Sequence, residues 1–138
     1  MATIFDACIP RPEVLQGELR EEIFAARLRD VIDGTAEAVY QDPHTFVDNP
    51  CPPAGLKTLL EEALGRLTAT PPTGNPIIRL ETSFGGGKTH NLIALYHAAR
   101  GSPEATRFVA SDLIPAPGTV RIAGVVGSDL DPSTGILH

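Results

Sequence analysis

The stretch "LETSFGGGKTH", residues 80–90, places three glycines directly before a lysine and a threonine. Glycines let a chain wrap closely around an anion with its N–H groups pointing inward, and a helix beginning just behind adds partial positive charge. A lysine after such a loop reaches the β- and γ-phosphates of a nucleotide, and the next hydroxyl coordinates Mg²⁺. The predicted binding positions for ATP with Mg²⁺ are therefore Gly85, Gly86, Gly87, Lys88 and Thr89, with Thr89 as the metal ligand.

One position departs from the usual phosphate-binding pattern. In G-x-x-x-x-G-K-[ST] a glycine stands six positions before the lysine, and here that position is Thr82. The departure leaves the shape of the loop open over residues 82–84. The alternative interpretation is a glycine turn before an ordinary amphipathic helix.

The segments that must position this loop alternate in type. "IIRLE" (77–81) and "TVRIAGVVG" (119–127) predict strands, and "THNLIALYHAAR" (89–100) predicts a helix between them. Strand, glycine loop, helix and strand in this order predict an α/β fold, with the start of the parallel sheet of a P-loop NTPase. In that sheet, the strand at 119–126 would lie at an exposed edge.

The first half of the chain has the pattern of helices. Apolar spacing predicts a helix within residues 13–32 and another over 54–67, and Asp42 followed by Pro43 predicts the start of a short helix between them. "TATPPTGNP" (68–76) has the composition of a linker. We therefore expect a helical N-terminal region at 1–70 and a truncated P-loop nucleotide-binding region at 71–138.

Composition and charge narrow the class of protein. The chain has 138 residues, of which 42% are hydrophobic and 20% charged, as in an ordinary globular domain. No apolar run is long enough to span a membrane, and the N-terminus lacks the pattern of a signal peptide, which predicts a cytoplasmic protein without membrane association. Residues 1–70 carry 12 acidic and 6 basic side chains (net −6), and residues 71–138 carry 5 of each (net 0). This distribution disfavours direct binding of nucleic acid by this segment.

The sequence also resembles a known family. "RLETSFGGGKTHNLIALYHAAR" (79–100), preceded by "VYQDPHTFVDN" (39–49), is similar to the N-terminal part of a family of large P-loop ATPases of uncharacterised domain type, related to AAA+ proteins. Genes for members of that family often lie beside DNA methyltransferase genes in phage-defence clusters. The resemblance implies that this chain is the front end of a longer protein. It also implies that the family shares the variant loop, and that His90 follows the nucleotide-binding positions at the helix start.

Hydrolysis requires more than a phosphate-binding loop. A carboxylate must hold Mg²⁺, and another group must orient the attacking water. Asp129 and Asp131 are weak candidates for the carboxylate because they resemble turn residues, and Glu81 is equally explained as a surface residue. The histidines and cysteines do not have the spacing of a metal site, because His90 and His97 lie two turns apart and His44 and Cys51 have no partner.

We therefore expect a segment that binds ATP but does not hydrolyse it by itself. The complete protein is expected to be an ATPase that acts in a defence or DNA-transaction assembly. The assembly is implied by the resemblance only. The enzyme alternative is a small-molecule P-loop kinase, and the non-enzymatic alternative is a nucleotide-gated scaffold whose helical half binds a partner. Other protein subunits or self-association are the expected contacts. The sequence predicts a solvated helix face at Arg27 and Arg29, and a core position at Leu92.

Overall fold

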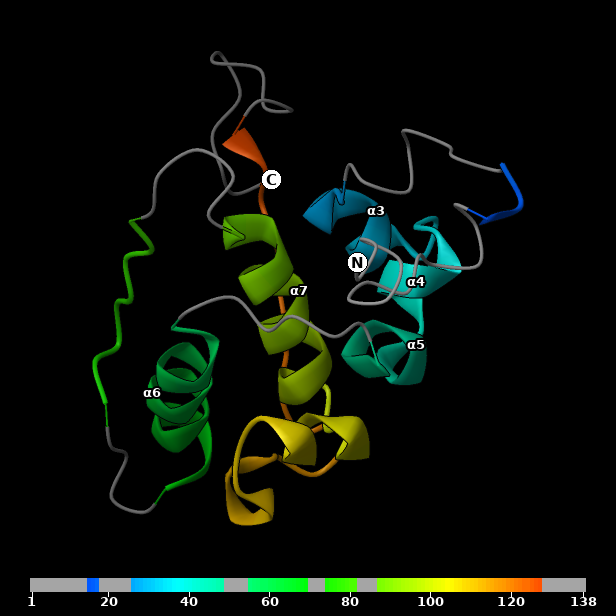
Figure 1. The fold of residues 1–138 in the computed structure, drawn as a ribbon. Coiled ribbons are helices and arrows are strands. Elements are labelled where there is room, and N and C mark those ends of the chain that lie inside the picture. Colours follow the sequence, from blue (N-terminus) through cyan, green and yellow to red (C-terminus); the bar gives the residue numbers. More distant parts are fainter. Residues whose placement is uncertain (1–14, 18–25, 49–54, 70–73, 82–86, 128–138) are drawn as a thin grey trace, which may run out of the picture.

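The structure, a computed structural model, describes residues 15–17, 26–48, 55–69, 74–81 and 87–127. Its regular elements are the α-helices and 3₁₀ helices (η) α3 (Leu28–Asp33), α4 (Ala38–Gln41), α5 (Pro43–Asp48), α6 (Leu56–Thr68), α7 (Lys88–Ala99), η2 (Pro103–Arg107) and η3 (Ser111–Leu113). Helix α7 runs through the middle of the molecule, with α6 on one side and α3, α4 and α5 on the other (Figure 1). The two 3₁₀ helices lie at its C-terminal end (Figure 1).

Helix α7 is central because most of its circumference is buried. Seven of its residues are buried, and both Ile93 and Ala98 are fully enclosed. The helix begins after Gly87, which has a φ of 75°, and the chain leaves it at Gly101, with a φ of 83°. A Cβ at Gly101 would lie 2.6 Å from the carbonyl oxygen of Pro115, so the chain passes too closely there for any other residue.

Helices α5 and α6 pack on α7 or on the elements around it, as their sequences predict. In α6, Leu56, Leu60 and Leu64 follow one another at four-residue spacing and are buried against the common core. Pro43 is the first residue of α5, and the Asp42 carboxylate accepts a hydrogen bond from the Thr45 N–H at 2.9 Å. The predicted helix at 54–67 and the predicted start of α5 are thereby confirmed. Bonds from Thr45 also hold the pKa of Asp42 below its ordinary value.

The predicted parallel sheet is wrong for the residues that the structure describes. Residues 77–81 and 119–127 are extended, but neither forms a strand, and no backbone hydrogen bond joins them within the described ranges. In Figure 1 the first segment runs outside α6, whereas the second passes behind α7. Ile77 is 84% exposed, while Val120 packs against the core. A helical core therefore replaces both the sheet and the exposed sheet edge.

The sheet prediction is wrong because β-propensity indicates that a segment is extended and half-buried, and it does not indicate whether the segment pairs with another strand. Part of the segment at 119–127 packs on helices, whereas Ile122 and Val125 stay 38% and 51% exposed. A Cβ on Gly124, for example, would meet the side chain of Ile32 in α3. Hydrogen-bond pairing depends on a second extended segment in register, and the two segments lie too far apart to supply it.

The helix predicted within residues 13–32 is described only in part, with Leu15 helical and α3 starting at Leu28. Arg27 has extended backbone angles (φ −114°, ψ 120°), and α3 starts at Leu28. Gly34, with a φ of 76°, ends α3 as the sequence predicts. Residues 13, 14 and 18–25, and with them most of the predicted helix, lie outside the described residues. The predicted division at residue 70 stays a prediction, although α6 and α7 on its two sides share one core.

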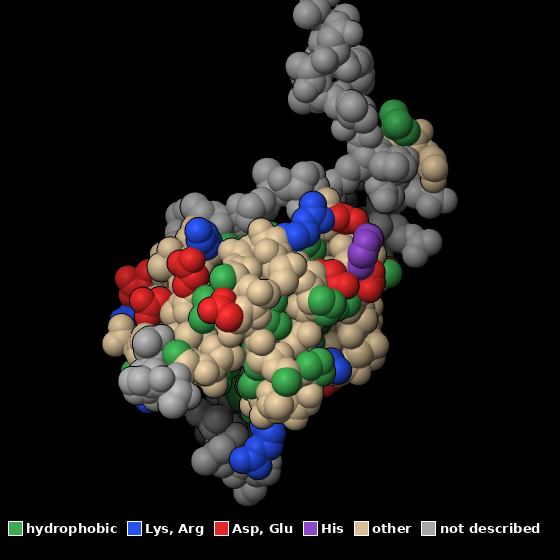
Figure 2. Space-filling view, turned by 90° about the horizontal axis from the view of Figure 1, so that it is seen from below, with side chains coloured by type: hydrophobic (Ala, Val, Ile, Leu, Met, Phe, Trp, Pro, Cys, Tyr) green, Lys and Arg blue, Asp and Glu red, His purple; other side chains and the backbone are tan. Residues whose placement is uncertain are grey.

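The surface at the η2 and η3 end of the molecule is mixed in charge. Figure 2, which looks at this end, shows small groups of acidic side chains and single basic ones separated by uncharged surface. None of the helices in the described ranges has the length and apolar character needed to cross a membrane.

Candidate functional site

The described part of the glycine loop is its last residue and the helix behind it. Gly87 is the N-cap of α7, and Lys88, Thr89 and His90 form the first helical turn. Thr82, Gly85 and Gly86 lie outside the described residues, so the predictions for them stay predictions. The predicted helix start near Lys88 is confirmed.

This helix end has the electrostatics that an anion site requires. An α-helix leaves the N–H groups of its first turn without partners inside the helix, and its dipole makes that end partly positive. Gly87 has no side chain with which to cap these groups, and the first turn contains no acidic residue. Nothing in the first turn of α7 therefore competes with an anion for the helix end.

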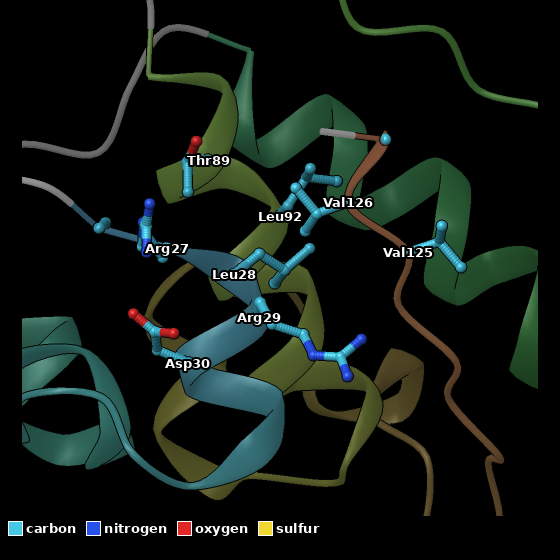
Figure 3. A pocket seen from close by; sticks show the side chains of 10 residues that line it. Arg27, Leu28, Arg29, Asp30, Thr89, Leu92, Val125 and Val126 are labelled. Atoms are coloured by element: carbon cyan, nitrogen blue, oxygen red, sulfur yellow. The ribbon is translucent and has the colours of Figure 1, made fainter. Parts of the chain in front are cut away.

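A cavity of about 380 Å³ lies beside the first turn of α7. Thr89 and Leu92 line it from α7, and Val125, Val126 and Gly127 line it from the extended segment. The remaining wall is the start of α3 with the two residues before it, 26–30. Figure 3 shows Leu28, Leu92 and Val126 gathered at its centre, with Thr89 and Arg27 at one end. The cavity thus has an apolar interior and a polar end beside the helix start.

The charged residues of the cavity come from the start of α3. Arg29 forms an ion pair with Asp33, with its Nε 2.7 Å from Oδ2. Arg27 and Asp30 also line the cavity, and neither side chain has an ion pair or hydrogen bond within the described structure. Arg27 and Arg29 are both exposed, as the expectation of a solvated face requires, and both also line the cavity.

His90 points to another part of the molecule. Its ring stacks on Phe46 of α5, with ring centroids 4.4 Å apart and an angle of 27° between the planes. Burial lowers the pKa of His90, so the ring is neutral near pH 7. Adjacent positions on a helix are about 100° apart, which is why Thr89 lines the cavity and His90 packs on α5. Its predicted contact with nucleotide stays a prediction, and its observed role is in packing.

The other candidate chemical groups do not gather at this cavity. Glu81 is exposed and forms an ion pair with Arg79 at 2.7 Å. His97 is buried, and its Nε2 donates a hydrogen bond to the Tyr40 carbonyl oxygen at 2.8 Å. No cluster of three histidine, cysteine, aspartate or glutamate side chains that could hold a metal occurs in the described ranges. Asp129, Asp131 and Cys51 lie outside them.

Sequence reasoning missed the cavity because its walls are far apart in the chain. Arg27 and Asp30 precede the glycine loop by more than fifty residues, and no local pattern connects them to Thr89. The only available signal was the unusual residue type at the start of α3, an arginine where a helix usually has Ser, Thr, Asp or Asn.

Comparison with known proteins identifies the family. The model of the DUF499 N-terminal domain matches residues 8–114, which include the glycine loop, α7 and the start of α3. The chain belongs to the DUF499 N-terminal domain family. The family match covers the parts of the cavity lining that come from α7 and from residues 26–30. It does not cover the lining residues 125–127. Neither the curated proteins nor the solved structures gave a match.

Proposed function

We propose that this chain binds Mg·ATP through residues 85–89 and the N-terminal end of α7, as part of a P-loop ATPase. The observation that carries the proposal is the position of Gly-Gly-Gly-Lys-Thr at the start of a 12-residue helix, with Thr89 lining a cavity of about 380 Å³. Lys88 would neutralise phosphate charge, and the N–H groups of the first turn would donate to phosphate oxygens.

The residues at the helix start fit a nucleotide with its metal ion. A positive φ at Gly87 lets the chain turn sharply into α7, as a phosphate-binding loop requires. Thr89 offers a hydroxyl oxygen, the hard ligand that Mg²⁺ prefers. When bound, Mg²⁺ would offset the charge of the β- and γ-phosphates. The protein's own contribution is to hold the phosphates at the helix end, beside the apolar side chains of the cavity.

The larger context of the proposal is an ATPase in a defence or DNA-transaction assembly, which rests on the resemblance of residues 39–49 and 79–100 to that class of ATPase. Within this chain, we propose binding without appreciable turnover. The support is that Glu81, which precedes the loop in the sequence, is paired with Arg79 on the exposed surface.

The chain's lysines make the test of nucleotide binding direct. The sequence contains two lysines, Lys88 at the start of α7 and Lys57 on α6, where it lies 3.7 Å from Glu61. Lys88→Ala should abolish binding of a fluorescent ATP analogue in the presence of Mg²⁺, because it removes the charge that offsets the phosphates. Lys57→Ala removes the same charge from another helix and should bind as the wild type does. Equal affinity in the wild type and Lys88→Ala would end the proposal.

A further inference from the structure

The cavity beside α7 gathers positive charge in a chain that is acidic as a whole. The formal net charge of the protein is −6, and its first half holds the excess of acid. The described lining of the cavity contains Arg27, Arg29 and Asp30. Because Asp33 pairs with Arg29, the charges of Arg27 and Asp30 balance, and the partial charge of the helix end makes the cavity positive. A cavity with this balance favours an anionic ligand.

The two arginines differ in what already holds them. Arg29 is bound to Asp33 on the next turn of α3, at 2.7 Å, and that ion pair satisfies its charge. Arg27 has no ion pair or side-chain hydrogen bond with any described residue. Figure 3 shows Arg27 at the same end of the cavity as Thr89, on the opposite wall. Of the two, Arg27 is therefore the one with all of its donors unengaged in the described structure, whereas Arg29 has its Nε bound to Asp33.

The stability of α3 does not explain an arginine at this position. Arg27 is the N-cap of α3 and makes no side-chain capping bond. A helix N-terminus favours Ser, Thr, Asp or Asn as its cap, and the helix dipole disfavours a cation there. A residue that breaks a local rule without a local compensation is often retained for function.

We infer that Arg27 is a binding residue that contacts the phosphate groups of the nucleotide from the wall opposite Thr89. The inference rests on the proposed function and deepens it by assigning a second cationic contact. The planar guanidinium of an arginine can donate two parallel hydrogen bonds to one phosphate, which fixes the direction of the phosphates as well as their charge. Arg27 thus couples the start of α3 to nucleotide bound at α7.

Calorimetric titration of the whole chain with Mg·ATP and with adenosine tests the inference. Arg27→Ala should weaken ATP binding by about tenfold to a hundredfold, the effect of losing charge-assisted hydrogen bonds to phosphate. Its affinity for adenosine should stay within about twofold of the wild-type value, because adenosine has no phosphate to lose. Arg27→Lys keeps the positive charge but loses the planar guanidinium, so its affinity for ATP should lie between those of Arg27→Ala and the wild type.

Arg29→Ala is the matched control, because it removes the same charge from the same cavity but from a residue already paired with Asp33. It should change ATP affinity by less than about threefold. If Lys88→Ala loses ATP while Arg27→Ala binds it as the wild type does, the inference is overturned and the proposed function stands. Equal losses for ATP and adenosine in Arg27→Ala would also overturn it, because the effect would then be a structural one. Unchanged binding in all of these variants would end the proposed function itself.

Discussion

Thr89 and His90 are neighbours in the sequence but serve different parts of the molecule. Thr89 lines the cavity beside the helix start, and His90 stacks on Phe46 in the core between α5 and α7. His97, two turns later, lies against the same Phe46 ring and donates to the Tyr40 carbonyl oxygen. Packing of these two histidines anchors the helix whose first turn forms the candidate site.

Neutral buried histidines predict a specific response to acid. Burial lowers the pKa of His90, and it is the main cause of the lowered pKa of His97, against the hydrogen bond to Tyr40 that raises it. In the unfolded chain both titrate near the ordinary value of about 6.5. The unfolded state therefore takes up protons first as the pH falls. The stability that these groups contribute is complete above about pH 6.5 and is lost as the pH falls from there through their folded pKa values.

We expect His90→Gln to make this acid loss shallower, because glutamine does not titrate. The free energy of unfolding, measured by urea denaturation at several pH values from about 7.5 to 5, should fall less steeply than in the wild type. His44→Gln, which removes a histidine exposed on α5, controls for the substitution itself. Parallel curves for the wild type and His90→Gln would show that the ring at α5 is not the group that titrates.

At the scale of elements, local sequence signals predicted the helices but not whether the extended segments pair into a sheet. Asp42 and Pro43 determine the start of α5 within one turn, and leucines at three- and four-residue spacing specify α6. These determinants lie inside the segment that they describe. A strand, in contrast, depends on a partner elsewhere in the chain, and residues 77–81 and 119–127 have none in the described structure. The sheet prediction failed at this step.

The turn that ends α7 provides a prediction at the same scale. Gly101 has a φ of 83° and sits where a Cβ would come within 2.6 Å of the Pro115 carbonyl oxygen. Gly101→Ala should therefore lower the free energy of unfolding by at least about 1–2 kcal/mol, the cost of the left-handed conformation alone. Gly118→Ala is the matched control, since Gly118 also has a positive φ of 78° but its Cβ would meet no atom within 4 Å. Chemical denaturation of the two variants should separate them clearly, and equal stability would contradict the close approach at Gly101.

At the scale of the whole molecule, one helical core supports a site at its edge. The buried core joins α3, α5, α6 and α7, and the candidate site lies where α3, α7 and the extended segment meet. The start of α7 after Gly87 was predictable because its signals are consecutive in the sequence. The opposite wall was not, because only the packing of α3 against α7 brings Arg27 and Asp30 beside Thr89.

A ligand at this edge should stabilise the entire core. Mg·ATP at about 100 times its dissociation constant adds roughly 2.7 kcal/mol to the folded state. In a domain of this size, that energy corresponds to a rise of roughly 8 °C in the melting temperature. We expect this rise in thermal melts of the wild type and of Lys57→Ala, and none in Lys88→Ala. A wild-type melting temperature indifferent to Mg·ATP would contradict binding at this site.

The most direct measurement of the central claim is lysine acylation of the wild-type chain, read by mass spectrometry with and without Mg·ATP. Lys88 and Lys57 are the only lysines in the sequence, so each serves as the reference for the other. Phosphates bound at the start of α7 would cover the Lys88 amine and leave Lys57, on α6, as reactive as before. The account predicts that saturating Mg·ATP slows acylation of Lys88 at least about tenfold, with Lys57 unchanged. Equal acylation rates at Lys88 with and without nucleotide would contradict it.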